Sequence, residues 1–489
     1  MSQRFVRDTL GLAVSQYLAR GILLARGVLA AITLGPAGFG QWNALNLILD
    51  YSGYAPAGAL QGLDLRLPAP TARGDAGEAR RLLAGAWTMV LAGGTLFALL
   101  LVAAFASGRP TLLRGLGWNA PLLMLAAALL QLVLQYHGSA LRARGRFSAV
   151  SGSSAVQALL GGGLGLALVW RFGIPGLLWG WLAGTLVALA WVRLAAPDVL
   201  LRPGAPAEGV RLVRGGFVVF AFFAVSLALR SVDRLALIHY GTPADLGAYS
   251  LGIMAAGLVL YVPEAAAAVL YPRIAAAAGD TRGLEFMSGQ VARAHRALAV
   301  LLPLAVAVAM VWVAPALAWW LPRYRDAGEA VRLLTLGSLL LSGATLPAYW
   351  LLGSGRARSL LLAGLACAAV TALLVFVVAA RAPRPSPVAL AACAGYGVFA
   401  VAIATLAARD LRPGRGGRLA FAVSSFLPAV WAAAAAFVAC RVGPAELVIA
   451  AGARTVAVAL AYAPVLWWLG RGLGLRALAS RWARGEASA

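Results

Sequence analysis

Two arginines lie deep inside the first apolar segment of the sequence. Arg20 and Arg26 fall within residues 9–33, a stretch otherwise long and apolar enough to cross a bilayer. A guanidinium at membrane depth is expensive, so it usually faces a wet cavity or a charged partner. Because its planar fork donates paired hydrogen bonds to phosphate oxygens and stays charged, arginine suits a phosphate-bearing ligand. Six residues turn about 120° around a helix, so we expect these arginines to line two sides of one cavity wall. Gln16 lies one turn before Arg20 and adds an amide to the same face.

A second charged cluster lies in the apolar segment 217–239. It contains Arg230, Asp233 and Arg234, and the two arginines are spaced to share one helix face. The cluster predicts a second cationic wall of the same cavity. The alternative is structural, because Asp233 is also spaced to pair with Arg230 and to stabilise this part of the fold.

Three acidic residues at membrane depth allow two interpretations. Asp50, Asp233 and Glu264 are either sites for a coupling proton or sodium ion, driven by the membrane potential, or they balance the charge of the arginines. The scattered histidines and cysteines lack the spacing of metal ligands, so no metal site, cofactor or catalytic residue is predicted. Aromatic residues such as Tyr249 are candidates for stacking on sugar rings, whereas Trp42 is interpreted as a membrane-interface anchor.

The composition indicates an all-α polytopic membrane protein. Hydrophobic residues make up 62% of the 489 residues and charged residues only 12%. A soluble domain carries roughly twice as many charged residues, about 25%. In lipid, a helix satisfies its backbone hydrogen bonds within itself. The sequence lacks the alternating pattern of barrel strands, so we expect the spans to be helices. About fourteen spans are predicted, at 9–33, 39–62, 82–106, 118–141, 150–170, 174–196, 217–239, 245–271, 294–320, 330–353, 360–380, 388–408, 419–440 and 445–469.

Arginine counting predicts the orientation. The net charge is +24 and all 41 basic residues are arginine. With the N-terminus inside, the loops assigned to the cytoplasm hold 26 arginines and the opposite loops hold 8. This bias follows the positive-inside rule, so we expect both termini in the cytoplasm of a bacterial cell, and no nucleic-acid partner. Without lysine no phosphate-binding P-loop exists, and no loop houses an ATPase or other enzyme domain.

An internal repeat predicts two lobes. Gly35-Pro-Ala-Gly-Phe-Gly-Gln-Trp42 is matched by Gly241-Thr-Pro-Ala-Asp-Leu-Gly-Ala-Tyr249, at an offset of about 206 residues. Six spans separate the copies, so both have the same orientation and the lobes form a parallel, pseudo-two-fold repeat of six helices each. The predicted domains are an N-lobe at 1–196, a C-lobe at 197–408, and two further helices with a cytoplasmic amphipathic tail at 409–489.

These motifs resemble the polysaccharide-transport branch of the MOP superfamily, of which Wzx-type O-antigen flippases are members. The resemblance rests on the arginine-bearing first span, the segment 35–42, the loop residues Gly74 and Asp75, Asp233-Arg234, Leu246-Gly-Ala-Tyr249 and Tyr271-Pro-Arg273. It implies a flippase of the inner membrane that carries a polyprenyl-diphosphate-linked oligosaccharide to the outer leaflet for surface polysaccharide synthesis. In the related lipid II flippases the last two of fourteen spans flank a lipid groove.

Three alternatives to an oligosaccharide flippase stay open. A lipid II flippase of peptidoglycan synthesis uses the same mechanics. A multidrug or cation antiporter of the same superfamily needs an acidic cavity, which the first-span arginines disfavour. The third is a non-transporting scaffold for glycan assembly. We expect a monomer whose partners are the lipid-linked oligosaccharide, membrane lipids and polysaccharide assembly proteins.

Overall fold

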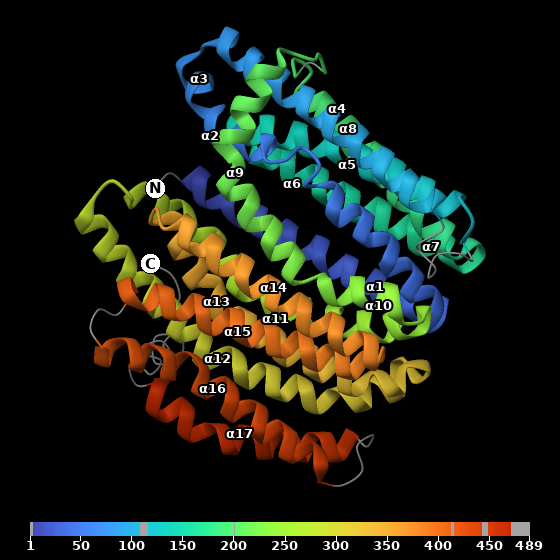
Figure 1. Cartoon of the computed structure of the whole chain (residues 1–489), viewed down its shortest axis with the longest axis vertical. Helices are drawn as coiled ribbons and strands as arrows, with labels where there is room; N and C mark the ends of the chain where they lie inside the picture. The colour runs from blue at the N-terminus through green and yellow to red at the C-terminus, as the bar shows by residue number, and fades with distance from the viewer. Residues whose placement is uncertain (1–2, 108–115, 200, 412–414, 443–447, 471–489) are drawn as a thin grey trace. The chain divides into compact units, whose positions relative to one another are not determined.

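The chain folds into helices throughout the part that can be described. The computed structural model describes residues 3–107, 116–199, 201–411, 415–442 and 448–470, without side chains for 3–20, 415, 419 and 470. No strand occurs in these ranges, and thirteen helices within them are long and apolar enough to cross a membrane. The predicted all-α polytopic fold class is therefore confirmed. The chain divides into two compact units, each drawn in Figure 1.

Unit 1 comprises Met1–Leu227 and Leu237–Gly247. A core of Leu63, Leu132 and Tyr136 packs α2 and α5 together, and the Tyr136 hydroxyl donates a hydrogen bond to the Leu83 carbonyl of α4. Its helices are α1 (Gln3–Ser52), α2 (Ala59–Arg66), α3 (Pro68–Arg73), α4 (Ala76–Ala106), α5 (Asn119–Ala143), α6 (Phe147–Val156), the π-helical segment η2 (Gln157–Gly161), α7 (Gly162–Phe172), α8 (Ile174–Ala195) and most of α9 (Pro206–Leu229).

Unit 2 comprises Ala228–Ala236 and Ala248–Ala489. Met310 of α12, Ala436 of α16 and Tyr462 of α17 belong to one core, and the Tyr462 hydroxyl donates to the Val300 carbonyl at 2.8 Å. Its elements are part of α10 (Val232–Tyr240), most of α11 (Pro243–Ala277), α12 (Thr281–Trp320), the 3₁₀ segment η3 (Pro322–Ala327), α13 (Gly328–Gly353), α14 (Ala357–Arg381), α15 (Pro385–Leu411), α16 (Arg415–Arg441) and α17 (Val448–Gly470).

The first two predicted spans meet in one kinked helix, so the described residues contain thirteen candidate spans where about fourteen were predicted. Gly35 has φ 67° and ψ −179° inside α1, a conformation that glycine adopts easily and that bends the helix before Pro36. The predicted continuous span 39–62 is wrong, because α1 ends at Ser52 and α2 begins at Ala59. Gly58 sits at φ 94° in the intervening turns.

The predicted span 217–239 is also interrupted. α9 ends at Leu229 and α10 begins at Val232, so Arg230 lies in the break and Arg234 lies in the first turns of α10. The interruption is stabilised by Asp233, whose carboxylate accepts the backbone N–H of Arg234 at 2.7 Å. The prediction that Arg230 and Arg234 share one face of a continuous helix is therefore wrong.

The two copies of the glycine-proline motif pack against each other within unit 1. A Cβ atom on Gly40 would lie 1.8 Å from the carbonyl oxygen of Pro243. A Cβ atom on Gly247 would lie 1.9 Å from the carbonyl oxygen of Pro36. The contact is reciprocal, since the proline carbonyl of each copy meets the glycine that lies four residues after the proline of the other copy.

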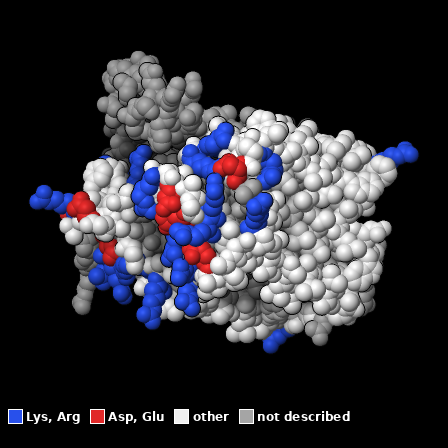
Figure 2. Space-filling model, turned by 90° about the horizontal axis from the view of Figure 1, so that it is seen from above, with Lys and Arg blue, Asp and Glu red and all other residues white. Residues whose placement is uncertain are grey.

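One end of unit 1 is covered by ion pairs. The helix ends there combine arginines with acidic residues of neighbouring turns, and Figure 2 shows blue and red side chains intermingled on this face. The pairs, with their N···O distances, are Arg73–Glu78 (3.0 Å), Arg142–Asp64 (3.0 Å), Arg144–Asp198 (2.7 Å) and Arg211–Glu208 (3.2 Å). At least one side chain of each pair is well exposed, and exposed pairs of this kind add little stability.

Candidate anion-binding site

The Arg26 guanidinium of α1 is held between two indole rings of unit 1. Its carbon Cζ lies 5.4 Å from the ring centroid of Trp42 and 4.8 Å from that of Trp181 in α8. Gly162 at the start of α7 lies beside the arginine stem, and a Cβ there would be 3.9 Å from Arg26 Cδ, an ordinary van der Waals distance. Arginine over the face of tryptophan is attracted by the ring quadrupole, which partly offsets the loss of hydration.

Aromatic stacking leaves the N–H groups of Arg26 available. Its Nη1 atom is buried and has no hydrogen-bond partner. Among the described residues, the guanidinium is contacted by the two rings and by no carboxylate. A buried donor without an acceptor costs about 1–3 kcal/mol, and more when it is charged. The arrangement is therefore suited to an incoming acceptor with negative charge.

The other residues predicted for this wall lie outside the described side chains. Arg20 and Gln16 are part of α1 by their backbone, but nothing is described of their side chains. Asp50, predicted near the middle of the second span, is exposed and lies close to the end of α1 at Ser52. The amphipathic tail predicted after residue 470 also lies outside the described residues.

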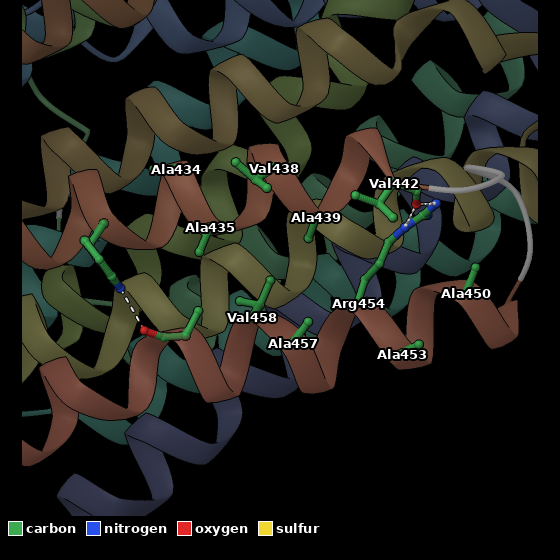
Figure 3. A pocket seen from close by; sticks show the side chains of 12 residues that line it. Ala434, Ala435, Val438, Ala439, Val442, Ala450, Ala453, Arg454, Ala457 and Val458 are labelled. Atoms are coloured by element: carbon green, nitrogen blue, oxygen red, sulfur yellow. Dashed lines mark hydrogen bonds between the residues drawn. The ribbon is translucent and has the colours of Figure 1, made fainter.

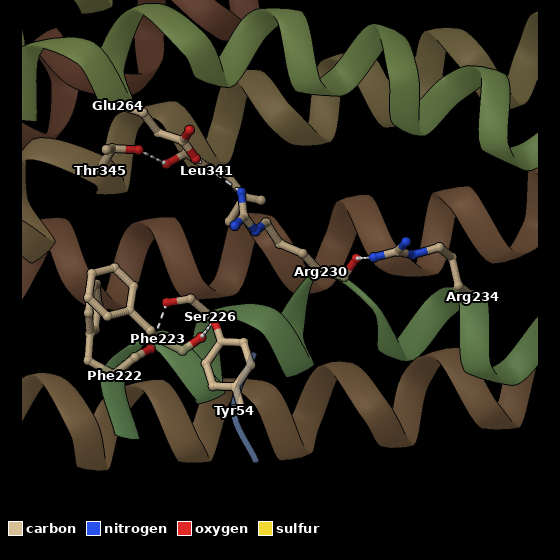
Figure 4. Close-up of polar contacts among 9 residues, drawn as sticks. All are labelled: Tyr54, Phe222, Phe223, Ser226, Arg230, Arg234, Glu264, Leu341 and Thr345. Carbon is tan, nitrogen blue, oxygen red and sulfur yellow. Dashed lines mark hydrogen bonds and ion pairs between the residues drawn. The ribbon is translucent and has the colours of Figure 1, made fainter. Parts of the chain in front are cut away.

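In unit 2, Arg230 pairs with a carboxylate. Its Nη1 atom lies 3.1 Å from Oε1 of Glu264 in α11, and both side chains are partly exposed (Figure 4). The Arg234 Nη2 atom donates to the Arg230 carbonyl at 3.5 Å. The structure thus brings these three predicted residues together, and the ion pair favours the charge-balance interpretation of Glu264.

Asp233 is buried and surrounded by hydrogen-bond donors. It accepts from the Tyr249 hydroxyl at 2.5 Å, the Tyr396 hydroxyl at 3.1 Å and the Arg234 backbone N–H at 2.7 Å. Only 1% of the residue is exposed. These three hydrogen bonds offset the free-energy cost of burying the carboxylate. Two of them come from tyrosines of α11 and α15, and none comes from Arg230.

Sequence reasoning missed three aromatic residues or misread their roles. Trp42 is 4% exposed and packs on Arg26, so its interpretation as an interface anchor is wrong. Tyr249 is fully buried against Asp233 and does not present a free ring face to a sugar. Trp181 was not singled out, although a tryptophan near the centre of a span is an available signal because interface anchors lie at span ends.

A separate apolar groove runs between α16 and α17, the red helices of Figure 1. Its volume is about 610 Å³. The walls are mainly alanine and valine side chains, with Trp431 among them (Figure 3). At one end the buried Arg454 donates to the Val442 carbonyl at 3.0 Å and 2.6 Å, from Nε and Nη2. Its guanidinium therefore binds the end of α16 instead of extending to the membrane surface.

No cluster of three or more potential metal ligands occurs among the described residues. The groups with chemistry to offer are thus the stacked Arg26, the compensated cluster around Asp233, and the apolar groove. Among these, Arg26 provides a buried donor without an acceptor, and the groove provides an apolar surface.

Comparisons with known proteins show which solved structures share this fold. No protein-family model matches the chain, and no curated protein matches it. Among solved structures it is similar to the lipid II flippase MurJ in an inward closed conformation, with a TM-score of 0.71, 12% identity, and coverage of 95% of this chain and 99% of that one. An inward-facing multidrug resistance MATE family transporter of the MOP superfamily gives a TM-score of 0.63 at 17% identity, covering 82% and 94%. The Vibrio cholerae MATE transporter VcmN in its bent form gives 0.54 at 16% identity, covering 84% and 99%. The chain therefore has the fold shared by MOP-superfamily flippases and transporters.

Proposed function

We propose that this protein is a flippase that moves a polyprenyl-diphosphate-linked oligosaccharide across the bacterial inner membrane by alternating access. The product is displayed at the outer leaflet for surface polysaccharide synthesis. The observation that carries the proposal is the buried Arg26 guanidinium, stacked between two indole rings with its Nη1 atom open. A diphosphate supplies the acceptor oxygens and the negative charge that this group lacks.

The groove between α16 and α17 supports the lipid part of the substrate. A polyprenyl tail is apolar along its whole length, so packing against alanine and valine side chains gives it favourable van der Waals contacts. The groove of about 610 Å³ offers such walls. Moving a lipid headgroup across a bilayer breaks no covalent bond, so we propose no enzymatic step.

Lipid II flippase activity is the second candidate. The similarity to the MurJ structure, which covers 95% of this chain, favours it. Lipid II also carries a diphosphate, and Arg26 therefore does not separate the two substrates. A cation antiporter is disfavoured, because a guanidinium without a neighbouring carboxylate repels a cationic drug.

The test is complementation of a deletion strain with variants expressed at equal levels. We expect Arg26→Ala to abolish surface-glycan display and to trap lipid-linked intermediates in the inner leaflet. Arg26→Lys keeps the charge but loses the planar fork, so it should retain partial display. Arg73→Ala removes an exposed arginine that pairs with Glu78, and serves as the control.

Three results would point elsewhere. Unchanged display with Arg26→Ala would contradict the diphosphate site. Lysis on depletion, rather than loss of surface glycan alone, would assign lipid II as the substrate. Absence of intermediates in the deletion strain, with no change in a drug-susceptibility panel, would favour a scaffold.

A further inference from the structure

A second buried donor lies on the ring that stacks against Arg26. The indole Nε1 of Trp181 is buried and has no hydrogen-bond partner. Native proteins leave few buried donors without an acceptor, so each one calls for an explanation. Other tryptophans of the chain are satisfied: Nε1 donates to the Ala149 carbonyl from Trp191, to Thr455 from Trp312, to Asp410 from Trp350 and to the Ala461 carbonyl from Trp431.

The open N–H groups of Trp181 and Arg26 belong to one stacked pair. The guanidinium carbon lies 4.8 Å from the Trp181 ring centroid, so the two groups that carry Nη1 and Nε1 are in contact. Both atoms are donors, and neither has an acceptor. The second indole ring of the stack, Trp42, has no such buried open donor. The two sides of the stack are therefore not equivalent.

Glycines fix the helix that carries Trp181. A Cβ on Gly180 would lie 2.1 Å from the Gly165 nitrogen, and a Cβ on Gly184 would lie 2.5 Å from Gly161 Cα. Such close backbone contact holds α8 against α7 and leaves little freedom to shift. Trp181 and Thr185 each follow one of these glycines by one residue, about 100° around the helix from the contact with α7.

A polar network holds the same turn of α8. The Thr185 hydroxyl donates to the Trp181 carbonyl at 2.8 Å and accepts from Gln157 Nε2 at 2.9 Å. Gln157 also donates to Gln131 Oε1 at 2.6 Å. Gln157 begins the π-helical segment, a rare conformation that is frequent at functional sites. The network uses the backbone of Trp181 and leaves its indole N–H free.

We infer that Trp181 Nε1 and Arg26 Nη1 together bind one phosphoryl group, which makes Trp181 a ligand-binding residue. The inference rests on the proposed function and adds a second donor to the same site. A phosphate diester or diphosphate brings acceptor oxygens with negative charge, which suits two neighbouring donors of which one is a cation. A sugar hydroxyl accepts hydrogen bonds but brings no charge, and a cation brings no acceptor, so both suit this pair less well.

The test measures binding of undecaprenyl diphosphate to purified full-length protein in nanodiscs, with undecaprenol as the probe without phosphate. Trp181→Phe keeps an aromatic ring against Arg26 and removes the N–H together with the five-membered ring, a loss of ring area that Trp42→Phe shares. We expect it to weaken diphosphate binding about tenfold, as loss of one hydrogen bond to a charged group does, and to leave undecaprenol binding unchanged. Trp42→Phe is the matched control, with an expected change below about twofold.

Equal binding by Trp181→Phe and Trp42→Phe would overturn the inference. Arg26→Gln separates its failure from that of the proposed function. If Arg26→Gln binds diphosphate as the wild type does, the anion site itself is wrong; if it loses binding while Trp181→Phe keeps it, only Trp181 is wrong. Should Trp181→Phe fail to fold, indole ¹⁵N spectra of the wild type decide. A new acceptor shifts a buried indole resonance on adding farnesyl diphosphate, and no shift overturns the inference.

Discussion

Units 1 and 2 each place an arginine within an apolar helical framework, but they compensate its charge differently. Arg26 of unit 1 stacks on the faces of Trp42 and Trp181. Arg230 of unit 2 pairs with Glu264 at 3.1 Å. Aromatic faces stabilise a guanidinium without occupying its N–H groups, whereas a carboxylate occupies them. The difference separates an arginine that is open to a ligand from one that is already bound.

A second difference in how arginines are held occurs at a turn found in both units. Gly145 and Gly355 have φ 69° and 84°, and each precedes an arginine that begins a helix. The Arg146 N–H donates to the Leu141 carbonyl and the Arg356 N–H to the Leu351 carbonyl, both at 2.9 Å. The hydrogen-bond acceptors of the two arginine side chains differ. Arg146 donates to the Ala195 carbonyl, and Arg356 donates to both carboxylate oxygens of Asp410 at 2.8 Å.

The largest expected effect concerns the reciprocal glycine contact. Gly40→Ala and Gly247→Ala each place a Cβ within 2 Å of a proline carbonyl, so each should destabilise the protein by about 3 kcal/mol or more. Since the contact is reciprocal, the two variants should be equally unstable in a thermal unfolding assay in detergent. Gly257→Ala is the control, because no atom lies within 4 Å of its Cβ position. Unequal losses of stability would show that the two motif copies do not contribute equally to the contact.

The next effect tests the buried carboxylate of unit 2. Asp233→Asn leaves a neutral amide facing two tyrosine hydroxyls and a backbone N–H, so we expect a loss of about 1.5–3 kcal/mol. Tyr396→Phe removes one of the three donors and should cost less. Asp245→Asn is the control, because it lies in the first turn of α11, where it accepts the Thr242 N–H and an asparagine oxygen also accepts this bond. Stability equal to the wild type in Asp233→Asn would mean that the carboxylate is not needed to hold these helices.

The sequence predicted the elements of the fold well, because membrane spans are long and their apolar pattern is strong. It failed where helices break. The interruptions after Ser52 and Leu229 lie inside apolar runs, and hydropathy does not respond to backbone conformation. Gly53, Pro56 and Gly58 were available as signals for the first break, but the break at Arg230 is stabilised by Asp233 and two distant tyrosines.

For the candidate site, the sequence indicated the arginines but not the residues that contact them. Arg26 and Arg230 stand out in the sequence because charge is rare in an apolar span. Their compensation depends on residues far away in the chain, namely Trp181 for Arg26 and Glu264 for Arg230. A single sequence without an alignment holds no information on such long-range pairs, so the open and the paired arginine could not be distinguished.

The arginines at the two turns, Arg146 and Arg356, give a third prediction, with a smaller effect on stability. Arg356→Gln removes a charged hydrogen bond to a half-buried carboxylate, while Arg146→Gln removes one to a carbonyl. We expect a loss of about 1 kcal/mol for the first and a few tenths for the second in chemical unfolding of the two variants. A larger loss for Arg146→Gln would show that the carbonyl anchor is the stronger one.

Removing the acid from unit 2 should make Arg230 resemble Arg26. Glu264→Gln breaks a partly exposed ion pair, so it should cost only about 0.5 kcal/mol of stability. The freed guanidinium should raise the retention of farnesyl diphosphate at low salt by about twofold, an effect that salt screens. Glu285→Gln, which neutralises an exposed glutamate elsewhere in unit 2, controls for net charge. If both variants gain retention equally, the gain comes from overall charge rather than from Arg230.

The smallest effect is the acid sensitivity of the ion pair at the end of unit 1. The hydrogen bond from Arg144 lowers the pKa of Asp198 below its usual value of 3.8. A lowered pKa means that the folded protein favours the charged carboxylate, so this contribution is fully present above pH 3.8 and is lost as the pH falls through the lowered pKa. Asp198→Asn should therefore remove a small part of the acid sensitivity in an unfolding titration over that range. The effect stays small because 67% of the Asp198 side chain is exposed, where water screens the pair. Arg144→Gln removes the partner of Asp198 instead of the acid and should change the titration to the same extent. Unequal changes in the two variants would mean that the acid sensitivity does not come from the pairing at this end of unit 1.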